Sequence, residues 1–330
     1  MLLALAGSLI ALDVAWAVAG HFLLDWPAYV RLGLLAIVLL GSARIYQTVR
    51  PDPKLSAMLF GAGFLCAFSM GASVLNYLLL TRAGTRIDAP LAALDRAMGF
   101  DWPAAMAWFG AHPALNFAAL VAYSSMLPQV AVMMVALALV DPARVYRFGA
   151  GLALSALTCI GVWCLMPSFG AFSVYPVPHM ALALDGGYAR ELVGLLRDGP
   201  GLISPRDAKG LIGFPSYHAV LALLVMWHAR DIRWLRWSAL VLNIAVLIAT
   251  PIQGGHHMMD VLGAIPVAAL ALFVARARKA VPETAKDAGL VNKRPNLTLE
   301  PVPLALFRIS AAQKNARAHN AIKPTLSGLP

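Results

Sequence analysis

The chain has 330 residues, of which 60% are hydrophobic and only 13% are charged, and its mean hydropathy is +0.72. A soluble domain carries roughly 25% charged residues, so this chain has too few to cover a water-exposed surface. Its formal net charge of +10 lies largely in short loops and in the C-terminal tail, a distribution typical of membrane proteins. No basic patch with base-reading elements accompanies that charge, so nucleic acid is not a predicted partner.

Apolar stretches follow one another along the chain up to about residue 275. Most are close to the roughly 20 residues with which a helix crosses a bilayer, so they predict an all-α polytopic membrane helix bundle of about eight transmembrane helices. The first stretch could instead be a signal peptide, but no Lys or Arg precedes it and Asp13 interrupts it. The predicted spans are residues 2–20, 29–46, 56–80, 115–140, 148–170, 216–229, 235–251 and 258–275.

Lys and Arg residues mark alternate loops between the predicted spans. They lie between spans two and three, four and five, and six and seven, and directly after span eight, whereas residues 250–257 contain neither. Because such residues are enriched in cytoplasmic loops, the pattern predicts a multi-pass cell-membrane protein with both termini in the cytoplasm. The loops before spans six and eight then face the non-cytoplasmic side. The residues that set this orientation are Arg44, Arg50, Lys54, Arg144, Arg147, Arg230, Arg233, Arg236, Arg276, Arg278 and Lys279.

Two longer segments, residues 82–114 and 171–214, lie on that predicted non-cytoplasmic face. Apolar spacing in the first predicts one or two amphipathic helices at the membrane interface, and the second contains a short helical stretch near 188–197. From about residue 280 the sequence is polar and has no apolar period. We therefore expect an N-terminal two-helix membrane segment (1–54), a membrane core (55–279) and a disordered basic cytoplasmic tail (280–330).

Four polar residues interrupt the predicted spans. Such side chains are costly in lipid and can be functional. We expect them instead to form hydrogen bonds between helices. They are Asp13, Asn76, Tyr123 and Gln129.

Two short stretches, Phe214–His218 and Gly255–Asp260, carry the chemistry, and each opens a predicted span. His256 and Asp260 are four residues apart, so at a helix start they share a face, and the carboxylate can hold a neutral imidazole in one tautomer for attack on phosphorus. His218 enters a helix whose first N–H groups are unpaired and bind phosphate. It is placed to protonate the leaving oxygen as general acid.

These stretches resemble two signatures of the type-2 phosphatidic acid phosphatase superfamily. Residues 214–219, Phe-Pro-Ser-Tyr-His-Ala, are similar to the second signature, and residues 255–263 are similar to the third. The two histidines are 38 residues apart with one span between them, which also resembles the family. The aromatic residue before Pro215 and the large residue before His218 resemble the inositol phosphorylceramide synthase-like (inositolphosphotransferase) branch, which transfers headgroup phosphates between lipids.

The resemblance implies a six-helix phosphatidic acid phosphatase-like core within residues 55–279. It implies an integral membrane lipid-phosphate phosphatase or phosphotransferase that acts on the non-cytoplasmic side through a phosphohistidine. His256 is then the nucleophile, Asp260 its orienting partner and His218 the general acid. Membrane lipids and a lipid phosphate substrate are the implied partners, and no cofactor is expected. No metal is expected either, because the sequence offers no cluster of carboxylates to hold one.

The sequence departs from the family at its phosphate-binding cations. The third signature usually has Arg six residues before the nucleophile, where this chain has Thr250, and the first signature, a Lys followed seven residues later by Arg-Pro, is not found. The best local substitutes are Arg206 and Lys209, which precede His218 on the same predicted outer loop. With Ser216 and Tyr217 they form the predicted phosphate-binding set.

Two alternatives stay open at the level of sequence. His257 competes with His256 as the nucleophile, although the spacing to Asp260 and the family signature both favour His256. Ser216 is not in a Gly-x-Ser-x-Gly elbow, so a hydrogen bond to phosphate is a better role for it than nucleophilic attack. The alternative function is a non-catalytic membrane transporter or accessory protein that retains the fold without the missing cations.

Overall fold

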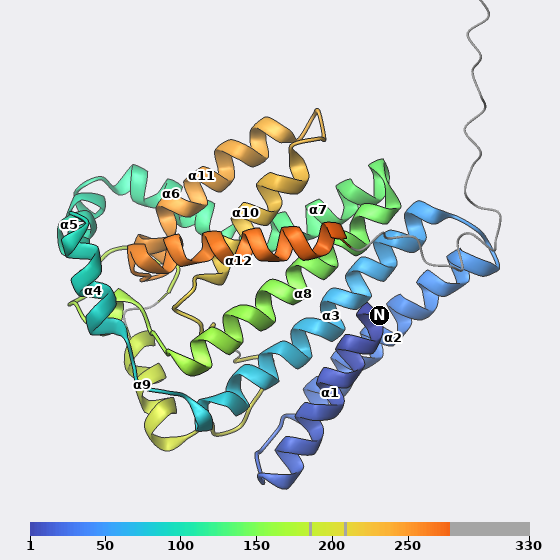
Figure 1. Ribbon diagram of the computed structural model, residues 1–330, viewed down its shortest axis with the longest axis horizontal. Helices are drawn as coiled ribbons and strands as arrows, with labels where there is room; N and C mark the ends of the chain where they lie inside the picture. The colour runs from blue at the N-terminus through green and yellow to red at the C-terminus, as the bar shows by residue number, and fades with distance from the viewer. Residues whose placement is uncertain (185–186, 208–209, 278–330) are drawn as a thin grey trace, which may run out of the picture. The chain divides into compact units, whose positions relative to one another are not determined.

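The computed structural model describes residues 1–184, 187–207 and 210–277, and the predicted tail lies outside these ranges. Within them the chain is helical and contains no strand, only an isolated bridge between Leu24 and Ile203 (Figure 1). The predicted all-α bundle is confirmed. The helices are α1 (Leu2–Ala19), α2 (Trp26–Thr48), α3 (Pro53–Leu79), α4 (Asp88–Ala97), α5 (Trp102–Ala111), α6 (Pro113–Ser124), α7 (Met126–Val140), α8 (Pro142–Leu165), α9 (Tyr188–Asp198), α10 (Tyr217–Ala229), α11 (Arg236–Gln253) and α12 (Met258–Ala277).

Four of these helices begin in the same way. An aspartate at the N-cap accepts a hydrogen bond from a backbone N–H of the first turn, and a proline occupies one of the first two helical positions. The carboxylate satisfies an N–H that has no partner inside the helix, and proline loses nothing there because its missing N–H would have been unpaired. The capping residues are Asp25, Asp52, Asp101 and Asp141.

Six of the described helices, α1, α2, α3, α8, α11 and α12, are long and apolar enough to cross a membrane. Large apolar side chains cover their outer faces: Ile37 is 67% exposed and Phe273 is 71% exposed. Surfaces of this kind are stable in lipid and not in water. The described residues therefore form a multi-pass membrane bundle. Helices α7 and α10, at 15 and 13 residues, are shorter, and their crossing remains a prediction.

The predicted single span 115–140 is wrong in one respect, because Ser125 divides it into α6 and α7. Pro128 has no N–H and its ring crowds the carbonyl of the residue four positions earlier, which weakens the helix at this point. Pro266, in contrast, is accommodated inside α12. The Ser125 hydroxyl donates to the carbonyl of Ala122 at 2.6 Å and closes the end of α6. Upstream, α5 and α6 meet at 112°, as a broken span or a re-entrant loop would.

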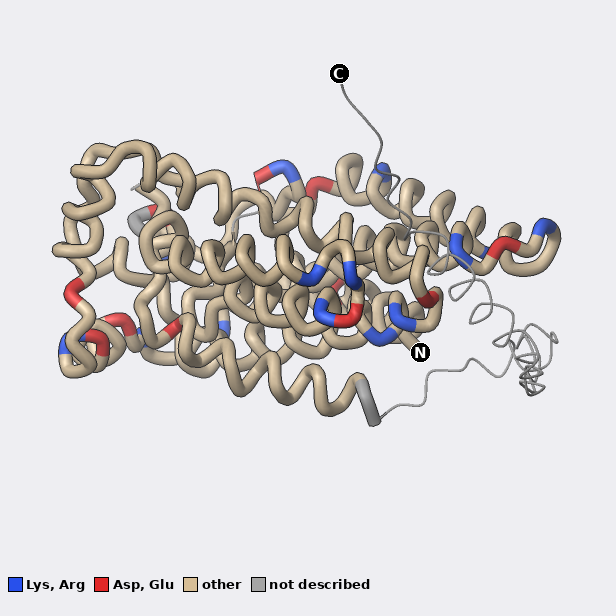
Figure 2. Tube along the Cα trace, turned by 90° about the horizontal axis from the view of Figure 1, so that it is seen from above, with Lys and Arg blue, Asp and Glu red and all other residues tan. Residues whose placement is uncertain are grey.

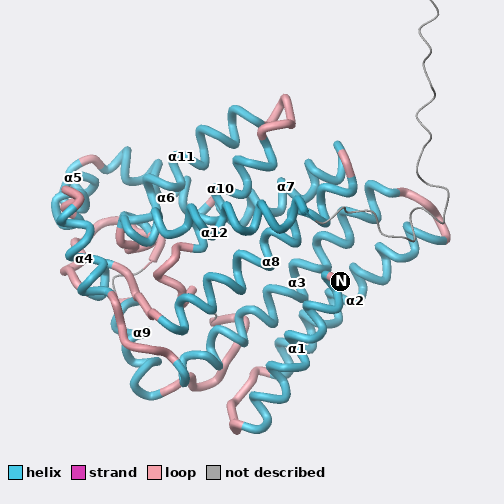
Figure 3. Tube along the Cα trace, in the orientation of Figure 1, coloured by secondary structure: helices cyan, strands magenta, loops and turns pink. Residues whose placement is uncertain are grey.

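Packing joins helices that are neighbours in the chain and helices that are far apart in it. Helix α3 contacts α1 and α2 as well as α8, α8 contacts α12 and α10, and α10 contacts α11, which in turn contacts α6. The segment 82–114 contains α4, which is amphipathic as predicted, and α5, which is apolar on all sides; the short helix predicted near 188–197 is α9. They lie at the same end of the bundle as the α1–α2 turn (Figure 1), where the longer loops also gather (Figure 3).

The turns that carry the arginines and lysines, α2–α3, α7–α8 and α10–α11, lie at the opposite end (Figure 1). Long runs of helix elsewhere contain no charged residue (Figure 2). Two of these turns touch, since the Arg144 guanidinium donates to the carbonyl of His228 at 2.7 Å. The loops predicted to share a side are therefore gathered at one end of the bundle.

The polar residues inside the spans behave differently from one another. Gln129 accepts a hydrogen bond from Asn243 of α11 at 2.7 Å, as predicted. Asp13 is buried, and neither of its carboxylate oxygens has a hydrogen-bond partner within the described ranges, so the prediction is wrong there. The amide oxygen of Asn76 is likewise unpaired within those ranges. Tyr123 lines a cavity together with His218 and His256.

Candidate active site

The two predicted stretches meet at the starts of α10 and α12. The backbone N–H of Ser216 donates to the carbonyl of Asp260 at 3.0 Å, which joins one stretch to the other. Ser216 is the N-cap of α10, and its hydroxyl accepts from the N–H of Ala219 at 3.4 Å. The start of α10 therefore lies beside the start of α12, and the first N–H groups of a helix such as α10 stabilise an anion.

His256 is held on both ring nitrogens. Its Nδ1 lies 3.1 Å from Oδ2 of Asp260, and its Nε2 lies 3.3 Å from the hydroxyl of Ser216. An ionised carboxylate only accepts hydrogen bonds, so the proton of a neutral His256 resides on Nδ1 and Nε2 presents its lone pair. The same Asp260 oxygen accepts from the N–H of His257 at 2.9 Å, which fixes the carboxylate. This is the arrangement of an oriented imidazole nucleophile.

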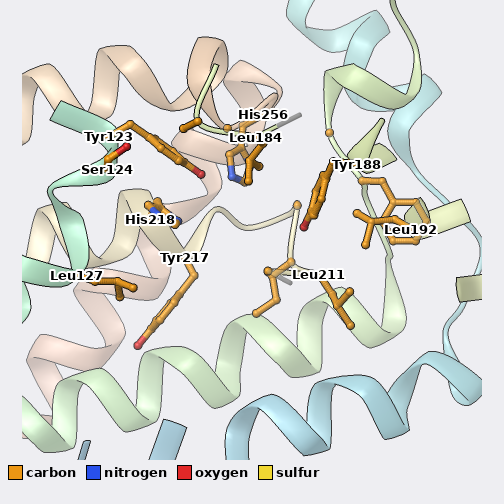
Figure 4. A pocket seen from close by; sticks show the side chains of 17 residues that line it. Tyr123, Ser124, Leu127, Leu184, Tyr188, Leu192, Leu211, Tyr217, His218 and His256 are labelled. Carbon is orange, nitrogen blue, oxygen red and sulfur yellow. The ribbon is translucent and has the colours of Figure 1, made fainter. Parts of the chain in front are cut away.

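His218 lines the same cavity as His256 and is held by an aromatic ring. The imidazole stacks on Tyr123 of α6, with centroids 4.4 Å apart and planes 8° from parallel. In the close view, Tyr123 spans the distance between the two histidines, with its ring over His218 and its hydroxyl toward His256 (Figure 4). The stacking restricts the orientation of His218 toward the cavity.

The cavity has a volume of about 350 Å³ and contains a polar and an apolar part. His218, His256 and the backbone of Gly254 line the polar part. Leucines and tyrosines from the outer segments line the remainder, among them Leu192 and Leu211 (Figure 4). Among the described residues that line it, none is Lys or Arg.

Two glycines allow close approach of the chain at the polar part of the cavity. Gly170 has φ +77°, and an added Cβ would collide with the carbonyl of Gly255, which accepts from the N–H of Ala171. An added Cβ on Gly254 would lie 2.5 Å from the hydroxyl of Tyr123. Side chains larger than hydrogen at these positions would displace the loop that carries His256.

His257, the competing nucleophile of the sequence, points away from this cavity into a buried charged cluster. Its Nε2 lies 3.7 Å from Asp88 and its Nδ1 lies 3.5 Å from Asp95, both on α4. These are ion-pair distances, too long for well-formed hydrogen bonds. Burial alone would lower the pKa of His257, but Asp88 and Asp95, with Asp260 nearby, outweigh it and raise the pKa to about 9. At neutral pH His257 is therefore a cation and a poor nucleophile.

The two α4 carboxylates also anchor both walls of the cavity. Asp88 accepts from the N–H groups of Phe169 and Gly170 at 2.8 and 3.0 Å, and it pairs with Arg86 at 2.7 Å. Asp95 accepts from the first two N–H groups of α12, Met258 and Met259, each at 2.9 Å. Helix α4 thus fixes the start of α12 and the Gly170 loop relative to each other. The charges facing His257 are these two carboxylates and Asp260, with Arg86 behind Asp88.

This cluster predicts a pH dependence of stability. The pKa of His257 is higher in the folded protein (about 9) than its ordinary 6.5, so its contribution is complete below pH 6.5 and is lost as the pH rises through 9. We expect the thermal unfolding temperature to fall over that window, and His257→Gln to flatten the fall. Thermal unfolding of both proteins in one detergent from pH 6 to 10 measures this. An identical slope in the two proteins would contradict it.

The predicted phosphate-binding residues are placed unequally. Ser216 lies beside Nε2 of His256, whereas the hydroxyl of Tyr217 donates to the carbonyl of Leu152 on α8, away from the histidines (Figure 4). Arg206 lies 3.9 Å from Asp25 and lines a separate cleft. Lys209 lies outside the described residues. Thr250, at the position of the missing arginine, is buried and bonds back to Val246 of its own helix at 2.7 Å.

Several residues of the site were not singled out from the sequence. Tyr188 of α9 lines the cavity, and Tyr123 was expected only to join two helices. Asp88 and Asp95 were seen only as charges of an outer segment. Their seven-residue separation on an amphipathic helix places them on one face, which was the available signal.

Among the described residues, no group of three or more His, Cys, Asp or Glu side chains is arranged to hold a metal ion.

Comparison with known proteins identifies the family of the chain. Residues 89–274, more than half of the chain, match the family model of the PAP2 superfamily, and the match contains all of α4 except its first residue, the cavity and both histidines. No curated protein and no solved structure matches the chain. The chain therefore belongs to the PAP2 superfamily, and a phosphatase or phosphotransferase fold follows from that membership.

Proposed function

We propose that the protein is an integral membrane lipid-phosphate phosphatase or phosphotransferase that acts through a phosphohistidine on His256. Membership of the superfamily supports phosphoric ester hydrolysis in general. The observation that carries the proposal is the pair of contacts on His256: Asp260 lies 3.1 Å from Nδ1 and Ser216 lies 3.3 Å from Nε2, at a cavity that His218 also lines.

The reaction takes two steps. In the first, Nε2 of His256 attacks phosphorus, the bond from phosphorus to the leaving oxygen breaks, and protonated His218 gives its proton to that oxygen. Asp260 stabilises the positive charge that the modified imidazole acquires. In the second, water or a lipid alcohol attacks the phosphohistidine, the N–P bond breaks, and His218 takes the proton of the acceptor. The hydroxyl of Ser216 and the N-terminus of α10 bind the phosphoryl oxygens.

The charge of the cavity favours a phosphodiester as the donor. A phosphomonoester carries −1.5 to −2 charges near pH 7, about twice the single charge of a diester. Lys and Arg are absent from the described lining, so the charge of the donor is met by the start of α10 and by the proposed Lys209. That balance suits a monoanion and supports the phosphotransferase branch that moves headgroup phosphates between lipids. Leu184, Leu192 and Leu211 offer an apolar wall for lipid chains.

A product analysis tests this function. Purified protein is incubated with labelled phosphatidic acid, a polyprenyl diphosphate or phosphatidylinositol, each with and without ceramide or diacylglycerol. A new phospholipid that needs the added alcohol identifies a transferase, and free phosphate identifies a phosphatase. We expect phosphatidylinositol with an alcohol acceptor to be the best combination. Absence of turnover with every substrate would favour the non-catalytic alternative.

Two substitutions distinguish the roles of Lys209 and Arg206 in the outer loop. We expect Lys209→Ala to lower turnover at least about a hundredfold, the typical effect of losing one transition-state donor. Because Arg206 lies beside Asp25 and outside the cavity, Arg206→Ala serves as the matched control and should change turnover only a few-fold. Initial rates at equal expression measure both effects. Equal losses in the two variants, or none in either, would show that Lys209 has no such role.

Sidedness is tested by cysteine labelling. In a background with Cys66, Cys159 and Cys164 replaced, single cysteines are placed at Gly201 and Arg233, which are both exposed and precede and follow α10 in the chain. An added Cβ on Gly201 meets no neighbouring atom within 4 Å. We expect an impermeant thiol reagent to label intact cells only at position 201. Labelling at position 233 alone would place the site on the cytoplasmic side.

A further inference from the structure

A second cavity, of about 180 Å³, lies at the other end of α10 from the candidate active site. His218 is near the first residue of α10 and His228 is near its last. Ten residues of α-helix separate them, about 15 Å along the axis at 1.5 Å per residue. The polar residues that line the second cavity come from the α7–α8 and α10–α11 ends: Arg144, Arg147, Trp227, His228, Arg230 and Asp231.

The charges of this cavity do not balance within the described residues. Asp231 is the one carboxylate among its lining residues, and it lies 3.4 Å from both Arg144 and Arg230. The Arg144 side chain is only 16% exposed. Arg147 has no ion-pair partner in the part of the chain that the structure describes. Three guanidinium groups therefore share one carboxylate, which leaves a surplus of positive charge around a hollow.

A buried polar atom at the cavity also lacks a partner. His228 is 8% exposed and lines the cavity, and its Nε2 forms no hydrogen bond with any described residue. The other side of its ring is occupied by Phe148, at a centroid distance of 5.1 Å. Buried nitrogen atoms without partners are rare, because their desolvation is not compensated. An oxyanion in the cavity would satisfy Nε2 and neutralise the arginines at once.

We propose that this cavity binds the phosphate of an anionic membrane lipid, with Arg144, Arg147, Arg230 and His228 as its ligands. Lipid is favoured as the source because apolar residues of α12, Leu272 and Ala275, complete the lining beside the arginines.

The location of the cavity relative to the bilayer supports the same source. Trp234 and Trp237, each 64% exposed, follow α10 at this end of the bundle. Tryptophan is enriched at the level of lipid headgroups, where one end of the ring meets lipid and the other meets water. The arginines of the cavity therefore lie where phosphate groups are concentrated. The inference concerns the face opposite the candidate active site and does not depend on the proposed function.

The test uses the full-length protein in zwitterionic detergent and compares three probes: dioctanoyl phosphatidylglycerol, dioctanoyl phosphatidylcholine and inorganic phosphate. Binding is measured by titration with native mass spectrometry or a thermal shift. We expect phosphatidylglycerol to bind and the zwitterionic lipid to bind at least about tenfold more weakly, since one charge-assisted contact is lost or opposed. Tight binding of inorganic phosphate at the same concentration would identify a free anion as the ligand and overturn the lipid assignment.

Matched variants assign the binding to this cavity. Arg147→Gln should weaken phosphatidylglycerol binding about tenfold or more, the usual effect of removing a charged partner. Arg233→Gln, an exposed arginine of the next turn that does not line the cavity, is the control and should bind as the unmodified protein does. Equal affinity in the Arg147 variant and the control would refute the site. His228→Phe, which removes Nε2 and keeps the ring, should also weaken binding, and undiminished affinity there would remove His228 from the ligand set.

Discussion

Replacing His256 with alanine should abolish turnover while the protein stays folded and inserted. The imidazole supplies the bond to phosphorus, and removal of a nucleophile that acts with partners typically costs at least about 10⁴-fold in rate. The imidazole of His256 has two side-chain hydrogen-bond partners, Asp260 and Ser216. Its removal therefore costs little packing energy. Initial rates of phosphate release or lipid transfer, with equal amounts of purified protein, measure the effect.

A trapping experiment distinguishes loss of chemistry from loss of structure. Labelled donor lipid followed by rapid denaturation should leave acid-labile label on the unmodified protein and none on His256→Ala. His257→Gln is the neighbouring control: it breaks the buried cluster with Asp88 and Asp95 but keeps Nε2 of His256, so label should still appear. The assignment fails if His256→Ala retains activity or label while His257→Gln loses it.

Replacing His218 should slow turnover by about 10²–10⁴-fold, the usual contribution of a general acid or base. The first step needs a proton donor only when the leaving oxygen is a poor leaving group. With a p-nitrophenyl phosphodiester, whose leaving phenolate is stable, His218→Gln should therefore still release one equivalent of p-nitrophenol rapidly. The following dephosphorylation needs His218 as base, so steady-state turnover should stay slow. Stopped-flow absorbance resolves the burst from the steady rate.

Tyr123 supplies the matched control for His218. Tyr123→Phe keeps the ring that stacks on the imidazole at 4.4 Å and removes only the hydroxyl, so the burst and the steady rate should change only a few-fold. If His218→Gln loses the burst with the activated substrate as fully as it loses turnover of a lipid, its role is in binding or structure and not in proton transfer.

Much of the architecture could be predicted because it depends on local sequence. Apolar length predicted about eight spans, of which six described helices are long and apolar enough to cross a membrane. Alternation of arginines and lysines predicted which turns lie at the same end of the bundle. The division between α6 and α7 was missed, because the span was predicted from apolar length alone. Apolar length takes no account of the backbone hydrogen bond that Pro128 cannot form. The prediction for Asp13 was wrong because it assumed a hydrogen bond to a neighbouring helix, and the described helices offer its carboxylate none.

The sequence by itself predicted the pairing of His256 with Asp260, since residues four apart at a helix start can share one face. It did not determine the state of His257. That residue is cationic only because α4, more than 160 residues earlier in the chain, brings Asp88 and Asp95 against it in a buried setting. The stacking of Tyr123 on His218 and the distance of Arg206 from the cavity were likewise decided by packing. Local spacing fixes contacts within one turn of helix, whereas charge state, orientation and access depend on elements that meet only when the bundle is assembled.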